Sequence, residues 1–210
     1  MKVVNFKNNA LFLILLLVFF NQNFAQTKTV AQIDKYAKTV SRLMETQKQR
    51  IFADISSNGK KSNWNEFKTE KMRDSADTGD NLSENAYVWM KNGKIVSTTF
   101  TFQSPSRDWA HFVTYYFRAD GTLAKAESTL NTFYGNVTAD RNYYFDSKGK
   151  IVKQNVKYLD LETQKPINLI QLRKRQDFID RKVKFFKTTN KLPFIKLINK
   201  KQRGKQSNKF

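Results

Sequence analysis

The chain contains one histidine, His111, and no cysteine. A histidine acts as a general base only when a nucleophile or a substrate proton lies within its reach, and no nucleophile stands beside His111 in the sequence. The lack of cysteine excludes catalysis by a thiol. We interpret His111, which lies between Trp109 and Phe112 at the entry to a strand, as a structural or surface residue. No catalytic motif is found, so an enzyme is only the third hypothesis for function.

Three carboxylates at a spacing of three residues, Asp74, Asp77 and Asp80, are the best candidates for a metal site. A Ca²⁺ loop also needs a glycine at its turn and a closing glutamate in a fixed pattern, which this segment lacks. A solvated acidic stretch is the simpler interpretation. The sequence also has no phosphate-binding glycine loop. No metal and no cofactor are therefore expected.

Two tyrosine pairs, Tyr115-Tyr116 and Tyr143-Tyr144, place one ring on each face of a strand. We expect Tyr115 and Tyr143 in the core. Tyr116 and Tyr144 would then form an exposed aromatic strip on which a sugar or a peptide can stack. The alternative, which we favour, is ordinary cross-strand pairing between aromatic side chains.

The C-terminal segment, residues 166–210, is the most basic part of the chain. It holds 14 Lys and Arg and 2 Asp, which is +12 of the formal net charge of +20. Basic residues interleaved with Phe, Ile and Leu are typical of a segment that lies on anionic lipid or binds another polyanion. The alternative is that its apolar residues complete the core while its lysines solvate the surface. The candidate residues for an anionic surface are Lys182, Lys184, Lys187, Lys191, Lys196, Lys200, Lys201 and Arg203.

A sequence repeat predicts the strands that carry several of these residues. Gly93, Gly121 and Gly149 stand 28 residues apart, and each follows a tyrosine by six residues and a second aromatic residue by four. A fixed period indicates architecture more strongly than local propensity does. Asn92-Gly93 and Asp120-Gly121 are also strong signals of hairpin turns. We predict three hairpin repeats over residues 85–160, which make an antiparallel meander of about six strands.

Period-two alternation predicts which residues of the meander share a face. If each loop has two residues, the aromatic residue four positions before each glycine lies opposite the alternating apolar residues of the strand that follows the glycine. The opposite face would be polar and solvated, as in many antiparallel sheets. A G1 bulge at any glycine would shift this pairing by one residue. The residues predicted on the apolar face are Trp89, Val96, Phe100, Phe102, Phe117, Ala124, Leu130, Phe145, Val152, Val156 and Tyr158.

An amphipathic helix is predicted before the sheet, over about residues 29–55. Thr29 and Gln32 have the spacing of a capping box, and apolar residues then recur every three or four positions as far as Met44. We expect this helix to cover the apolar face of the meander. Residues 56–84 are polar and are predicted to be a connecting loop. Two further helix faces are indicated in the basic segment by Ile179, Val183, Phe186, Phe194, Ile195 and Ile198.

Residues 1–25 have the layout of a secretory signal peptide. Lys2 and Lys7 precede 11 consecutive apolar residues, and a short polar stretch ends at Ala25. The rival interpretation is an uncleaved anchor, but 11 residues are far fewer than the ~20 that span a bilayer. We predict cleavage after Ala25 and a periplasmic or secreted location in a bacterium.

Together these patterns predict an α+β fold in which the N-terminal helix packs on one face of the meander. Residues 26–165 would form the single domain, followed by the basic segment. The leading hypothesis is an exported, non-enzymatic binding or accessory protein of the bacterial envelope whose basic segment contacts an anionic surface or lipid. The alternative is a periplasmic carrier of an apolar ligand or lipid between sheet and helix. Export argues against intracellular nucleic acid as a partner.

Overall fold

The computed structural model describes residues 29–56, 61–76 and 84–200 of the chain. These residues form an eight-stranded antiparallel sheet with helices, so the predicted α+β class is confirmed. The expected signal peptide and its cleavage site after Ala25 lie outside the described residues.

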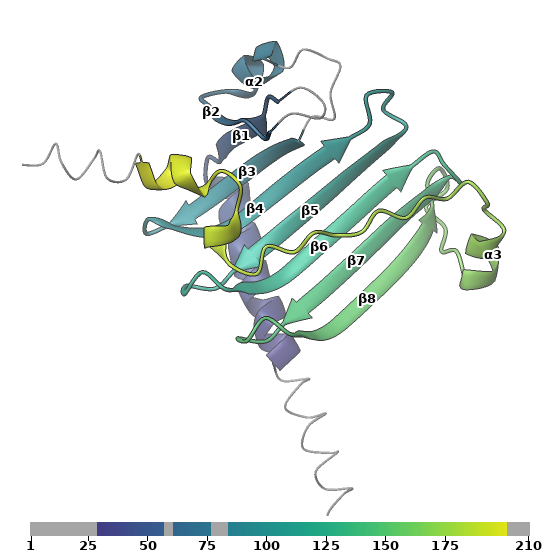
Figure 1. The fold of residues 1–210 in the computed structure, drawn as a ribbon. Coiled ribbons are helices and arrows are strands. Elements are labelled where there is room, and N and C mark those ends of the chain that lie inside the picture. Colours follow the sequence, from purple (N-terminus) through teal and green to yellow (C-terminus); the bar gives the residue numbers. More distant parts are fainter. Residues whose placement is uncertain (1–28, 57–60, 77–83, 201–210) are drawn as a thin grey trace, which may run out of the picture.

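The sheet is a meander from β3 to β8, and β1 and β2 extend it beyond β3 (Figure 1). The strands are β1 (Arg50–Asp54), β2 (Trp64–Phe67), β3 (Glu84–Lys91), β4 (Lys94–Gln103), β5 (Trp109–Phe117), β6 (Leu123–Thr132), β7 (Val137–Phe145) and β8 (Ile151–Asp160). The helical elements described are the N-terminal helix (residues 29–46), α2 (Glu70–Ala76), α3 (Leu169–Arg173), the 3₁₀ turn η1 (Thr189–Lys191) and a C-terminal helix (residues 195–200).

The predicted count of about six strands is wrong, because β1 and β2 form where a helix end and a loop were expected. The N-terminal helix ends at residue 46, well before 55, and β1 follows it. In β1, Ile51, Phe52 and Ala53 are all buried. A short apolar run suits either a helix or a strand, and here pairing with β3 decided the outcome. β2 pairs on the other side, where the Arg50 guanidinium donates to both carboxylate oxygens of Glu66 at 2.9 Å.

The three predicted hairpins form at β3–β4, β5–β6 and β7–β8, each with its glycine at positive φ. Their loops differ in length. Asn92-Gly93 is a two-residue loop between a paired Lys91 and Lys94. In the second hairpin the last paired residues before the loop are Phe117 and Leu123, six positions apart. The last paired residues of the third hairpin, Phe145 and Ile151, are also six positions apart. Each hairpin also has a bulge three residues after its glycine, so the pairing shifts there.

The difference in loop length inverts the strand before the glycine in the first hairpin, β3, relative to β5 and β7. Trp89 lies on the face that the N-terminal helix covers, whereas Phe117 and Phe145 lie on the opposite face. The prediction that these three aromatic residues share one face is therefore wrong. One residue more or less in a loop moves every following side chain to the other face of a sheet.

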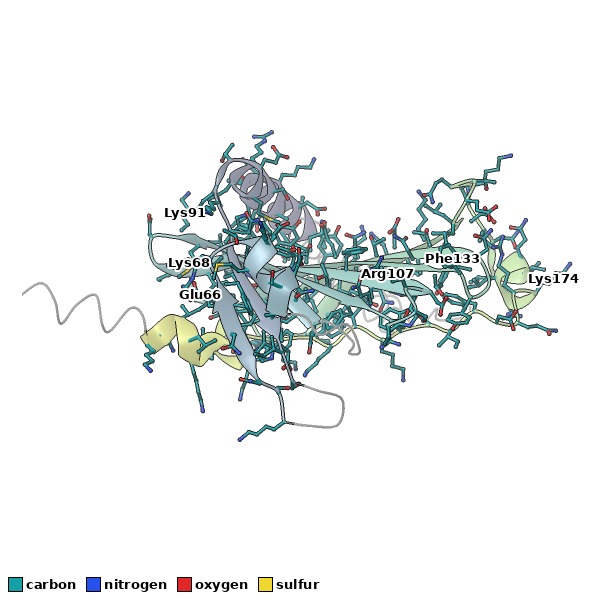
Figure 2. The ribbon with its side chains drawn as sticks, turned by 90° about the horizontal axis from the view of Figure 1, so that it is seen from above. Glu66, Lys68, Lys91, Arg107, Phe133 and Lys174 are labelled. Atoms are coloured by element: carbon teal, nitrogen blue, oxygen red, sulfur yellow. The ribbon has the colours of Figure 1, made fainter. Side chains whose placement is uncertain are left out.

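Both faces of the sheet are covered, which corrects the expectation of one solvated face. Figure 2 shows the N-terminal helix on one side and residues 181–200 on the other. We call residues 181–200 the strap. The strap belongs to the main core, in which Phe194 stacks on Phe52 with ring centroids 4.5 Å apart. Other strap residues buried in this core are Phe186, Leu192 and Ile198.

Candidate functional site

Figure 1 shows the strap crossing one face of the sheet. Exposed lysines recur along it. The strap contains no acidic residue. Six of the eight residues predicted for an anionic surface are described, and all six are exposed; Lys201 and Arg203 lie outside the described residues. We call these six the lysine row: Lys182, Lys184, Lys187, Lys191, Lys196 and Lys200.

The backbone conformation of the strap explains why its lysines point outward. Residues 181–187 are not helical, so the helix predicted from Val183 and Phe186 is wrong at this place. In an extended chain alternate side chains point to opposite sides. Val183 and Phe185 therefore pack on the core, while Lys182 and Lys184 are exposed. The second predicted helix does form, at the end of the strap.

Hydrogen bonds to the sheet fix the backbone beneath the lysine row. The Tyr115 hydroxyl donates to the carbonyl oxygen of Lys184, and the Leu123 amide donates to that of Lys187 at 2.9 Å. Burial, assisted by the nearby Glu84, raises the pKa of Tyr115, so its hydroxyl stays a donor. Glu84 itself is close to Lys184, and burial raises the pKa of this carboxyl. The lysines thus project from a fixed backbone.

Two arginines hold the beginning of the strap. The buried Arg141 of β7 forms an ion pair with Asp180 at 2.5 Å. The guanidinium of Arg181 lies over the ring of Trp109, 3.7 Å from its centroid. Sequence reasoning missed both contacts, since the partners in each pair are far apart in the chain. The strap is consequently anchored at its start as well as along its length.

Tyr116 and Tyr144, the predicted ligand-binding residues, are only 4% and 5% exposed. The exposed aromatic strip considered from the sequence does not form, because the N-terminal helix packs on the face that carries these two rings. The Tyr116 hydroxyl donates to a carboxylate oxygen of Glu127 at 2.8 Å. Burial, with Glu127 as the next cause, raises the pKa of Tyr116 to about 12. Stacking of a sugar or a peptide on these rings would require the helix to leave the sheet.

Lys125 pairs across the sheet with Tyr116 on one side and with Tyr144 on the other, and it is only 7% exposed. Its ammonium contacts carboxylate oxygens of Asp34 and Glu127, each at 2.7 Å, and lies 5.0 Å from the ring centroid of Tyr144. Burial alone would lower the pKa of Lys125, but the hydrogen bonds to the two carboxylates outweigh burial and raise it. Because Asp34 belongs to the N-terminal helix, this network ties the helix to the sheet.

His111 is buried, with 4% of its surface exposed, and its Nε2 lies 2.8 Å from the Ser128 hydroxyl. Burial is the main cause that lowers its pKa to about 4, and the positive charges of Arg141 and Arg181 lower it further. The ring is therefore neutral at pH 7. Its position in the packed interior agrees with the structural interpretation of this residue.

The predicted acidic stretch is described only at Asp74, which forms an ion pair with Arg73 in α2. Asp77 and Asp80 lie outside the described residues. Within the described ranges, no three His, Cys, Asp or Glu side chains gather in a way that could hold a metal ion.

The packing offers no observation in favour of the carrier alternative. One face of the sheet is filled by the N-terminal helix and the other by the strap. An open cleft of about 350 Å³ lies between the helix and the tips of two hairpins, and its lining includes Arg118 and Asp146. Arg118 already donates to the carbonyl oxygens of Leu123 and Phe145.

No protein-family model, no curated protein and no solved structure matches this chain. Within the described part of the chain, every helix is too short or too polar to cross a membrane. The lysine row is therefore assessed on its own geometry and charge.

Proposed function

We propose that this protein is an exported, non-enzymatic binding or accessory protein of the bacterial envelope, and that its lysine row contacts an anionic surface. One observation carries the proposal. The lysine row stands on a strap that has no acidic residue, and its backbone is hydrogen-bonded to the sheet.

The physical argument is that the row needs little rearrangement to bind. A flexible basic tail loses backbone entropy when it settles on a surface, at about 1–2 kcal/mol for each residue that becomes ordered. The strap is already ordered by its contacts with the core. Each lysine near an anionic membrane contributes about 1 kcal/mol, and salt screens this attraction over a Debye length of about 8–10 Å.

A matched pair of triple variants tests this proposal. The first replaces Lys182, Lys184 and Lys187 by glutamine. The control replaces three exposed lysines that are not on the strap, Lys35 and Lys38 of the N-terminal helix and Lys157 of β8, so that both variants lose the same charge. The proteins are residues 26–210, which include every described residue, and binding is measured by sedimentation with vesicles of phosphatidylglycerol and phosphatidylcholine.

The strap variant should bind about a hundredfold more weakly than the parent, since three lysines contribute about 3 kcal/mol. The control should lose far less affinity, and added salt should release the parent protein. Equal losses in the two variants would show that only net charge matters, which contradicts a role for the lysine row. A parent protein that binds neither these vesicles nor soluble polyphosphate at low salt would contradict the proposal as a whole.

A further inference from the structure

Large hydrophobic side chains are unusually exposed at one end of the sheet. Four described residues of this kind are at least 60% exposed: Phe133 (71%), Ile170 (69%), Leu169 (63%) and Ile179 (60%). The next most exposed, Met72, reaches 51%. Single exposed hydrophobic residues are normal on a protein surface, but a group of the most exposed ones at one place marks an interaction site.

Contacts between the β6–β7 turn and the segment after α3 show that the four residues belong to one end of the molecule. Arg175 donates to the carbonyl oxygens of Gly135 and Asn136. A Cβ atom added to Gly135 would lie 2.9 Å from the Cβ of Phe178, so these two backbones are close together. In Figure 2, Phe133 and Lys174 stand at the same end of the sheet, opposite Lys91.

Exposed basic residues lie beside these hydrophobic side chains. Residues 163–179, which include α3, contain four basic residues and one acidic residue, Asp177. Lys165, Arg173 and Lys174 are exposed there, whereas Arg175 forms an ion pair with Asp160 at 2.7 Å. We call residues 133–136 and 163–179 the α3 end. The strap begins at residue 181, so the lysine row continues directly from the α3 end.

We propose that the α3 end inserts into the surface of an anionic lipid bilayer. The inference rests on the proposed function, and it names the anionic surface as lipid. A surface that mixes exposed Ile, Leu and Phe with Lys and Arg matches the boundary between lipid headgroups and acyl chains. The core of a protein–protein interface, by contrast, is depleted in lysine. The hydrophobic side chains enter the acyl region, and the basic residues meet the phosphates.

The absence of cysteine permits a direct test of insertion, since a single introduced cysteine can be labelled selectively. Ile170→Cys carries an environment-sensitive nitrobenzoxadiazole dye at the α3 end, and Lys91→Cys carries it at the opposite end. Both proteins, as residues 26–210, are mixed with phosphatidylglycerol–phosphatidylcholine vesicles, with phosphatidylcholine vesicles and with soluble polyphosphate. The dye at position 170 should brighten and shift to the blue with the anionic vesicles alone, while the dye at position 91 stays unchanged.

An unlabelled double variant, Leu169→Ser with Ile170→Ser, tests the same inference through affinity. Both side chains are exposed, so the fold should be retained, and circular dichroism checks this. Binding to anionic vesicles should weaken by at least about tenfold, whereas binding to polyphosphate should not change.

Different results would contradict insertion of the α3 end and contact of the lysine row with an anionic surface. Vesicle binding with no dye response at position 170 and no loss in the serine variant would overturn insertion and leave the lysine row as the contact. Binding to polyphosphate without binding to anionic vesicles would also overturn insertion. A protein that binds neither would overturn insertion and the proposed function together.

Discussion

Protonation of His111 should destabilise this fold at mildly acidic pH. The neutral ring lies in the packed interior beside Ser128, and burial together with Arg141 and Arg181 lowers its pKa from 6.5 to about 4. In the unfolded chain the pKa returns to about 6.5. Between pH 6.5 and pH 4 the unfolded state therefore binds a proton that the native state does not. Stability is at its full value above pH 6.5 and decreases as the pH falls towards 4.

The size of this effect follows from the pKa difference. Where His111 is protonated in the unfolded chain but not in the native protein, proton linkage lowers the free energy of unfolding by about 1.4 kcal/mol for each unit that the pH falls. From pH 7 to pH 5 this amounts to about 2 kcal/mol, and protonation of both states limits the loss to about 3 kcal/mol. Such a change is a large part of the 5–15 kcal/mol that is typical of the free energy of unfolding of a domain.

Two measurements check this prediction. The first is urea unfolding of the parent and of His111→Gln at several pH values, because glutamine keeps a polar group towards Ser128 but does not titrate. The free energy of unfolding of the variant should fall by about 2 kcal/mol less than that of the parent between pH 7 and pH 5. The second is an NMR titration of the ring protons, which need no assignment because the chain has one histidine. Parallel pH curves for the two proteins, or an NMR midpoint near 6.5, would show that His111 does not destabilise the fold in this way.

Two further predictions concern the attachment of the helix and of the strap. Lys125→Met should lower the free energy of unfolding by about 2 kcal/mol, since the charged hydrogen bonds that hold the N-terminal helix are lost; an unchanged urea midpoint would contradict this role. Gly121→Ala should destabilise more than Gly93→Ala in thermal melts. Both glycines have positive φ, but an added Cβ at Gly121 would lie 2.8 Å from the Thr189 side chain, whereas at Gly93 it meets nothing within 4 Å. Equal losses would show that only backbone strain matters.

The hairpins are the part of the fold that sequence reasoning predicted best. Asn92 and Gly93 both have positive φ, whereas in the Asp120-Gly121 turn only the glycine does, and these residue types tolerate such backbone angles whatever surrounds them. The first loop has two residues between its last paired residues, Lys91 and Lys94, whereas the second has five, between Phe117 and Leu123. The period of 28 residues conceals this difference, and as a result Trp89 lies on the face opposite Phe117.

The candidate site was predicted in part. Lysines alternate with apolar residues from Lys182 to Phe185. Because alternate side chains of an extended chain point to opposite sides, this alternation predicts that the lysines face outward. The strap itself could not be predicted, because its anchors are distant in the chain. Tyr115 and Lys184 are 69 residues apart, and Arg141 and Asp180 are 39 apart. The exposed side chains of the α3 end carry no local signal either, since a leucine in a short helix is usually buried.

Local sequence is enough to predict the turns, the alternating strands and the accumulation of positive charge near the C-terminus. Each of these depends on backbone preferences or on composition within a few residues. What covers each face of the sheet depends on contacts between segments that are far apart in the chain. Two segments with apolar residues, the N-terminal helix and the strap, cover opposite faces of the sheet, and their local sequences do not show which face each one covers. The helix packs over Tyr116 and Tyr144 and the strap over Phe117 and Phe145, because side-chain volume and buried polar partners are matched only when the whole chain is assembled.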